Sequence, residues 1–272
     1  MLNSRISRIA TATLGATALA FSMVPGANAA RAQEDVPTFQ EFKAATFQDV
    51  GGQYVVNGDE TIVNAIKLRD YYEKMVNTRD TDSQSLVVNT VGGSDDLWSA
   101  SQAANLTYCV SDDFGADKSA MVSAMQSGAG QWEAASSGVN FTYVSSADSN
   151  CTTSNSAVVF SVEPIETSQY IARAFFPSSP SYQQNVLVDD SIWTSGSWTP
   201  SNIIAHELGH VLGFRHEHTR PEAGTCFEDN NWRPLTPYDS SSIMHYPQCN
   251  GSSSDLSMTS TDRAGVASVY GS

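Results

Sequence analysis

The chain has 272 residues and a formal net charge of −15 at neutral pH. This length suits one main domain with a sizeable core and a smaller accompanying segment. The negative charge argues against a nucleic-acid partner, whose phosphates it would repel, and favours solubility outside the cell. Charged residues make up only 16% of the chain, which indicates a secreted β-rich or mixed domain rather than a helical bundle.

Residues 1–29 have the pattern of a secretory signal peptide. Arg5 and Arg8 form a short basic start, residues 9–24 are apolar and rich in alanine, and residues 27–29 form an A-x-A cleavage site. A membrane anchor is the alternative, but the apolar run is short and interrupted by Thr and Ser. We therefore expect an extracellular protein with no stable membrane insertion.

Residues 30–96 contain neither cysteine nor histidine. Within them, residues 53–56 could form a strand, residues 60–76 have the apolar spacing of a helix, and residues 89–96 have the composition of a linker. We interpret residues 30–96 as a propeptide. A small N-terminal structural subdomain is the alternative.

The remaining residues, 97–272, are predicted to mix strands and helices. Apolar spacing predicts a helix over residues 117–135, although two glycines weaken it. Thr199 and Pro200 suit the N-cap and first position of a second helix, and a third is expected over residues 260–270. β-branched and aromatic runs predict strands at residues 106–110, 139–144, 157–162, 171–176 and 186–188. The expected fold class is α+β.

The second helix bears the motif HExxHxxGxxH. His206 and His210 are four residues apart, so both imidazoles project from one helix face and can reach one zinc ion. Gly213 can end the helix in the left-handed conformation, and His216 can then return as a third ligand. Three protein ligands leave zinc a position for water, which is typical of catalytic sites. Glu207 is placed to act on that water without being a ligand.

This motif is specific. It fixes five positions, and average residue usage makes a chance match in a chain of this length roughly one in a hundred thousand. All five histidines of the chain fall between His206 and His245. The alternative is an amphipathic core helix with incidental histidines.

Four cysteines in an oxidising compartment can form two disulfides in three ways. Sequence proximity favours Cys109–Cys151 and Cys226–Cys249, each worth about 3–4 kcal/mol through loop closure. Zinc ligation by these cysteines is the competing interpretation, but no C-x-x-C spacing supports it.

The zinc motif, followed by Ser-Ile-Met-His-Tyr at residues 242–246, resembles the metzincin metallopeptidases. It is most similar to the astacin type and to bacterial secreted peptidases of the HEIGH type. The resemblance implies a mixed, mostly parallel twisted sheet with a zinc-binding helix and a C-terminal helix. It also implies that Met244 forms a turn beneath the zinc, that Tyr246 is a mobile further ligand, and that Glu217 contacts the mature N-terminus.

Two further expectations follow from the resemblance. The strand at residues 171–176 is the candidate edge strand that pairs with an extended substrate, or else an ordinary sheet strand. Asp59, in the sequence Val-Asn-Gly-Asp, is a possible latency switch that ligates zinc in the zymogen; Val stands where astacin precursors have an aromatic residue, and Asn-Gly-Asp also occurs as an ordinary turn. A cysteine switch is excluded, because residues 30–96 contain no Cys.

We therefore expect a secreted, monomeric zinc metalloendopeptidase that acts on protein or peptide substrates, with one catalytic zinc ion, Glu207 as general base and Tyr246 as a stabiliser of the oxyanion. Calcium is possible at Asp189 and Asp190, but nothing indicates it. Two alternatives remain: an inactive zinc-containing binding or adhesion module, and a zinc amidase acting on cell-wall peptides.

Overall fold

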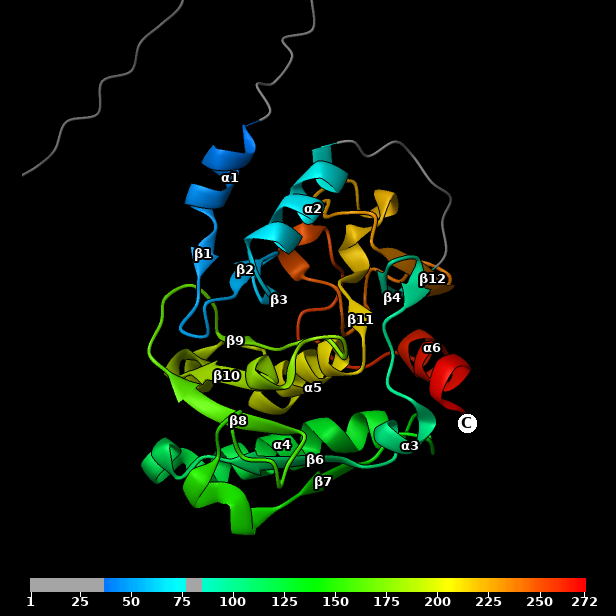
Figure 1. The fold of residues 1–272 in the computed structure, drawn as a ribbon. Helices are drawn as coiled ribbons and strands as arrows, with labels where there is room; N and C mark the ends of the chain where they lie inside the picture. The colour runs from blue at the N-terminus through cyan, green and yellow to red at the C-terminus, as the bar shows by residue number, and fades with distance from the viewer. Residues whose placement is uncertain (1–36, 77–84) are drawn as a thin grey trace, which may run out of the picture. The chain divides into compact units, whose positions relative to one another are not determined.

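The computed structural model describes residues 37–76 and 85–272, so the predicted signal peptide lies outside the described residues. The described residues form one unit (Figure 1). Its helices are α1 Phe39–Ala45, α2 Ala65–Val76, α3 Ala100–Ala103, α4 Lys118–Glu133, α5 Pro200–Val211 and α6 Ser260–Tyr270. Its strands are β1 Phe47–Gln48, β2 Tyr54–Val56, β3 Glu60–Ile62, β4 Ser85–Val91, β5 Ser94–Asp95, β6 Leu106–Val110, β7 Phe141–Tyr143, β8 Phe160–Ile165, β9 Ala172–Arg173, β10 Asn185–Asp189, β11 Phe214–Arg215 and β12 Trp232–Thr236.

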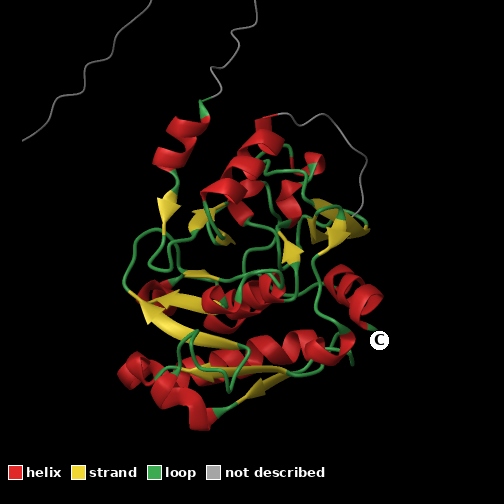
Figure 2. Cartoon of the chain, in the orientation of Figure 1, coloured by secondary structure: helices red, strands yellow, loops and turns green. Residues whose placement is uncertain are grey.

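A five-stranded sheet in the order β7-β6-β8-β10-β9 forms the main scaffold (Figure 2). Strands β7, β6, β8 and β10 run parallel to one another, whereas β9 runs antiparallel to β10. All five predicted strands are present. The fold class is α+β with a mixed, mostly parallel sheet, as predicted, and β9 occupies its edge.

The helices α4 and α5 pack against each other and against this sheet. Alternation along β6 turns Leu106, Tyr108 and Val110 into the main core, which also contains Met125 of α4 and Leu208 of α5. The close approach of the helices explains the presence of Gly128, one of the two glycines that lower the helix propensity of this segment. A Cβ atom on Gly128 would lie 2.9 Å from the side chain of Ile204, so only glycine fits there.

A second sheet has the order β11-β4-β12, with β5 paired to β4. The prediction of a linker over residues 89–96 is therefore wrong. The Gly-Gly pair at 92 and 93 is a tight hairpin turn, and both glycines have positive φ. Strand β4 buries Leu86, Val87 and Val88 completely or almost so.

Residues 37–76 form a small layer of their own, with a sheet in the order β1-β2-β3 that follows α1 and precedes α2 in the chain. The predicted helix over residues 60–76 is wrong at its start, because residues 60–62 pair with β2 as strand β3. The polar Gly-Asp turn before Glu60 makes this hairpin possible. The spacing of apolar residues within 60–76 could not predict the pairing with β2. Helix α2 begins only at Ala65.

Both disulfides favoured by sequence proximity are present, Cys109–Cys151 and Cys226–Cys249. The second closes the loop between the zinc-motif helix and residues 242–246. No helix within the described ranges is long and apolar enough to cross a membrane.

Candidate active site

Helix α5 places the first two histidines. It begins where the sequence predicts: the side chain of Thr199 accepts a hydrogen bond from the backbone N–H of Asn202, and Pro200 is the first helical residue. It ends at Val211, and Gly213 two residues later turns the chain with a φ of +94°, a conformation that favours glycine. A Cβ atom there would also lie 2.1 Å from the carbonyl oxygen of Asp96.

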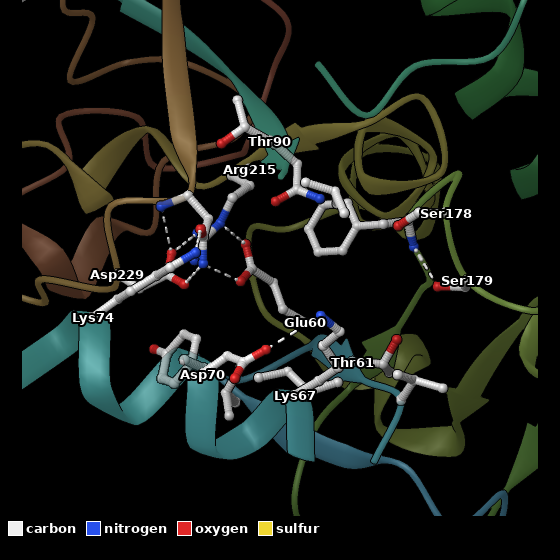
Figure 3. A pocket seen from close by; sticks show the side chains of 18 of the residues that line it. Glu60, Thr61, Lys67, Asp70, Lys74, Thr90, Ser178, Ser179, Arg215 and Asp229 are labelled. Atoms are coloured by element: carbon white, nitrogen blue, oxygen red, sulfur yellow. Dashed lines mark hydrogen bonds and ion pairs between the residues drawn. The ribbon is translucent and has the colours of Figure 1, made fainter. Parts of the chain in front are cut away.

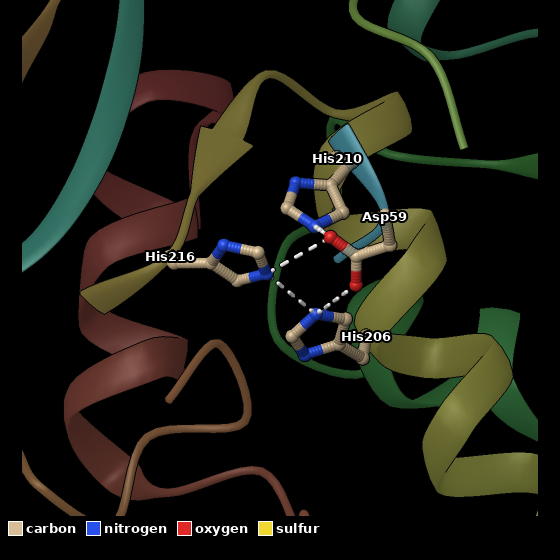
Figure 4. Close-up of side chains that lie close together, drawn as sticks. All are labelled: Asp59, His206, His210 and His216. Carbon is tan, nitrogen blue, oxygen red and sulfur yellow. Dashed lines mark hydrogen bonds and ion pairs between the residues drawn. The ribbon is translucent and has the colours of Figure 1, made fainter. Parts of the chain in front are cut away.

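The turn after α5 brings the third histidine back to the first two. The Nε2 atoms of His206 and His216 are 3.2 Å apart. The ring centroids of His210 and His216 are 4.8 Å apart. All three rings are buried. Figure 4 shows them turned toward one another. The structure thus brings together the three residues that the sequence predicts as metal ligands.

Each histidine is oriented through its other ring nitrogen. Nδ1 of His206 donates to the carbonyl oxygen of Ile243 at 2.7 Å, and Nδ1 of His210 donates to that of Phe214 at 2.8 Å. Nδ1 of His216 lies 2.8 Å from a carboxylate oxygen of Glu228. With Nδ1 protonated, the lone pair on each Nε2 points to the common centre, the arrangement found in zinc sites. Glu228 was not predicted from the sequence, where it is the first of two adjacent acids and lies two residues after Cys226.

The donor set fits a zinc ion. Tetrahedral coordination at the usual Zn–N distance places two nitrogens about 3.3 Å apart, close to the 3.2 Å between His206 and His216. Buried Nε2 of His210 has no hydrogen-bond partner, which fits a metal ligand. Burial acts to lower the pKa of His216. The negative charges of Asp59 and Glu228 have the larger effect and raise that pKa well above its usual range. The centre therefore favours a positive charge. Burial lowers the pKa of His206 to about 4, so its ring is neutral, as a ligand must be.

Asp59, from the turn between β2 and β3, enters this centre. Its carboxylate oxygens lie 3.2 Å from Nε2 of His206, 3.5 Å from that of His210 and 3.1 Å from that of His216 (Figure 4). The four residues form a cluster able to hold one metal ion. Gly58 permits the approach, because its φ is +103° and a Cβ atom there would lie 3.1 Å from the hydroxyl of Tyr246.

Glu207 is buried beside the three histidines. Its Oε2 atom has no hydrogen-bond partner, so a proton acceptor is available there. Burial raises the pKa of Glu207 well above its usual range, and the charge of Asp59 adds to the effect, whereas His216 and Arg173 oppose it. Glu207, His206 and Tyr246 line one cavity of about 190 Å³, together with Tyr170 to Ala172 next to the edge strand.

Met244 and Tyr246 lie where the resemblance implies. Met244 is fully buried, and its sulfur packs so closely on α5 that a Cβ atom on Gly209 would lie 2.4 Å away. The glycine of the zinc motif thus makes room for the methionine. The ring of Tyr246 stacks on that of His206 with centroids 5.4 Å apart, and its hydroxyl donates to Asp59.

Glu217, His218 and His245 lie near the three histidines and have hydrogen-bond partners of their own. Glu217 is buried next to Arg220, with oxygen and nitrogen 3.6 Å apart, and accepts a hydrogen bond from the backbone of Asp239. His218 accepts a hydrogen bond from the backbone of Tyr246, and His245 is paired with the hydroxyl of Tyr238. His218 and His245 lie outside the cluster around Asp59, but His218 forms a second possible metal-holding group with His216 and Glu228.

A second contact with residues 37–76 lies just behind His216. Arg215 is buried against three carboxylates: Glu60 of β3 at 3.1 Å, Glu228 at 2.9 Å and Asp229. Figure 3 shows Glu60 and Asp229 turned toward the guanidinium group, at the wall of a cavity of about 260 Å³ that also adjoins α2. Neither Glu60 nor Arg215 was singled out from the sequence, because the pair is 155 residues apart.

Comparisons with known proteins agree with this site. Residues 97–223 match the family model for matrixin. The chain is 41% identical over 63 residues to high choriolytic enzyme 2 of Oryzias latipes, covering 17% of this chain and 22% of that protein. It is 35% identical over 91 residues to human tolloid-like protein 1, covering 25% of this chain and 9% of that protein. The chain thus spans less than a quarter of the length of these curated relatives.

Two solved structures are also similar, each at 18% sequence identity. Myroilysin has a TM-score of 0.46, with 68% of this chain and 98% of that chain covered. High choriolytic enzyme 1 of Oryzias latipes has a TM-score of 0.42, with 64% and 94% covered. From the zinc motif, the turn at Met244 and the family match, we conclude that this chain carries a matrixin-type domain of the metzincin metallopeptidases, with astacin-like relatives.

Proposed function

We propose that the chain is a secreted zinc-dependent endopeptidase that hydrolyses peptide bonds with Glu207 as general base. The observation that supports it most is the convergence of three buried histidines, each held through Nδ1 by its own acceptor. Bound zinc would lower the pKa of a water to about 7 and polarise the scissile carbonyl.

The chain's own residues supply the other steps. The unpartnered carboxylate oxygen of Glu207 takes a proton from the attacking water and later gives it to the leaving amine. The hydroxyl of Tyr246, once it is free of Asp59, stabilises the oxyanion. The free edge of β9 pairs with the backbone of an extended peptide.

Metal removal tests this proposal. We expect a zinc chelator to abolish cleavage of an unfolded protein such as casein by the processed chain, and added zinc to restore it. Reagents that block serine or cysteine nucleophiles should have no effect, because the mechanism uses neither. Cleavage that persists in metal-free protein, confirmed by elemental analysis, would contradict a zinc mechanism.

We further propose that residues 37–76 belong to a propeptide and that Asp59 keeps the zymogen inactive. Its carboxylate lies within 3.5 Å of all three histidines, where the catalytic water and substrate would bind. The boundary expected after residue 96 is not supported by β4, which pairs with both β11 and β12. We expect β4 to remain with the catalytic part.

The latency proposal predicts that the full-length Asp59→Ala chain cleaves faster than the full-length wild type. We expect a rise of about tenfold or more, which corresponds to about 1.4 kcal/mol of lost preference for the closed state. Asp70→Ala is the matched control, because Asp70 is half-exposed on α2 and pairs with Lys67. Equal rates for Asp59→Ala and the wild type would refute the switch.

A further inference from the structure

The hairpin between β1 and β2 places a second carboxylate against the catalytic part of the chain. Asp49 lies at its turn, where the backbone N–H of Asp49 donates to Gln53 and its carbonyl accepts from Gly52. Its side chain is fully buried and forms an ion pair with Arg173 of the edge strand β9, with Oδ2 2.7 Å from Nε. The hydroxyl of Tyr170 donates to the other oxygen at 3.2 Å. Two residues beside the reaction cavity thus hold one carboxylate.

The guanidinium group of Arg173 is held independently of Asp49. Nη1 donates to both the carbonyl oxygen and the side-chain oxygen of Asn185, each at 2.7 Å, from the neighbouring strand β10. These bonds lie within the catalytic part of the chain and do not depend on the hairpin. Arg173 is therefore expected to keep its position when residues 37–76 are removed.

The binding capacity of Arg173 is only partly used. Nη2 is buried and has no hydrogen-bond partner, although Nε and Nη2 together form the edge that binds a carboxylate with two parallel hydrogen bonds. Among the described residues after Ser85, no carboxylate forms an ion pair with Arg173. The nearby Glu163 accepts hydrogen bonds from Ser161 and Asn185 instead.

Removal of the hairpin would leave a cation and a hydroxyl without their partner. A guanidinium group beside a hydroxyl binds carboxylates through charge-assisted hydrogen bonds, so this site favours a new carboxylate. Tyr170 and Ala172 line the same cavity as Glu207, and β9 offers a free edge to an extended peptide. Residues 37–76 contact the residue that follows β9, since the hydroxyl of Thr61 donates to the carbonyl oxygen of Ala174 at 3.2 Å.

We propose that Arg173 and Tyr170 form a subsite for an acidic side chain of the peptide substrate, which Asp49 occupies in the precursor. This inference rests on the proposed peptidase function and adds a substrate class to it. Arg173 is then a specificity-determining residue, and the enzyme selects peptides with Asp or Glu at one fixed position relative to the cleaved bond.

A cleavage profile tests the subsite. The full chain is folded with zinc, its N-terminal segment is removed by limited proteolysis, and the new N-terminus is identified by mass spectrometry. The processed wild type is then given a peptide mixture that varies Asp, Glu, Asn and Gln at every position. We expect about a tenfold preference in kcat/KM for the acid over its amide at one position, the effect of one charge-assisted pair.

Matched variants separate specificity from folding. Arg173→Gln should lose the preference for the acid while it still cleaves the amide peptides, Arg173→Lys should restore part of the preference, and Tyr170→Phe should reduce it. An absent preference in the wild type, or an unchanged one in Arg173→Gln, would overturn the subsite. Should Arg173→Gln not fold, Tyr170→Phe decides in the same way. Failure of the wild type to cleave any peptide would instead refute the peptidase function.

Discussion

The three predicted ligands depend on what their distal nitrogens contact. His206 and His210 use backbone carbonyl oxygens, which move only if the fold moves. His216 depends on a side chain, Glu228, and Glu228 also contacts Arg215 at 2.9 Å. Burial opposes ionisation of Glu228, but His216 and Arg215 outweigh it and hold the pKa of Glu228 well below its usual range. Of the three groups that orient the histidines, only Glu228 is therefore a side chain that a substitution can remove.

Glu228→Gln should weaken zinc binding by about 10–100-fold, the usual effect of losing a partner that orients a histidine ligand. The variant keeps the size of the side chain but removes the charge that favours donation from Nδ1 of His216. Competition with a chelator of known affinity measures the effect. Glu222→Gln is a suitable control, because Glu222 is a partly exposed acid of the same loop. Equal zinc affinity in Glu228→Gln and the wild type would show that the contact is dispensable.

Residue types and spacing in the sequence were enough to predict His206, His210, His216 and Glu207 as one site. They could not predict Glu228, because its partner is set by the path of a loop that the Cys226–Cys249 bond closes. Gly209 was also overlooked as a site residue. Its lack of a side chain has meaning only once Met244 is known to lie against it.

At the level of helices and strands, local signals predicted the parts with strong periodicity or caps. Helices α4, α5 and α6 and the strands β6 to β10 lie close to their predicted positions. Two short segments were predicted wrongly. The three residues of β3 were predicted as the start of a helix, and the glycines of the β4–β5 hairpin were predicted as a linker. Both pieces are fixed by pairing with strands elsewhere, as β4 pairs with β11 and β12.

Strand β4 leads to a prediction about truncated chains. A chain that starts at Ser85 should fold cooperatively, whereas one that starts at Leu97 should lose about 5 kcal/mol or more of stability. The loss arises because Leu86, Val87 and Val88 are almost completely buried. It approaches the whole stability of a typical domain. Denaturation by urea compares the two chains. Equal midpoints and slopes would place the boundary after residue 96 and would contradict the structural role of β4.

Across the whole molecule, residues 37–76 cover the catalytic part at three buried carboxylates. Asp49 meets Arg173, Asp59 meets the three histidines, and Glu60 meets Arg215. These contacts join residues more than a hundred positions apart in the chain, so no local pattern in the sequence could predict them. Only Asp59 was anticipated, through the resemblance to astacin precursors. Together they explain how an acidic segment can dock on an acidic protein, since Asp49 and Glu60 each meet an arginine and Asp59 meets histidine ring nitrogens.

The most direct test of the account compares the processed wild type with processed Glu207→Gln, with the zinc content of both determined by elemental analysis. Glu207 is not within the group of metal ligands, so both proteins should contain one zinc ion per chain. The account predicts that the wild type cleaves casein and that Glu207→Gln is slower by at least about 100-fold, the usual effect of losing a general base. Equal cleavage by the two zinc-loaded proteins would contradict the mechanism. Zinc in both with cleavage by neither would identify a metal-containing binding module instead.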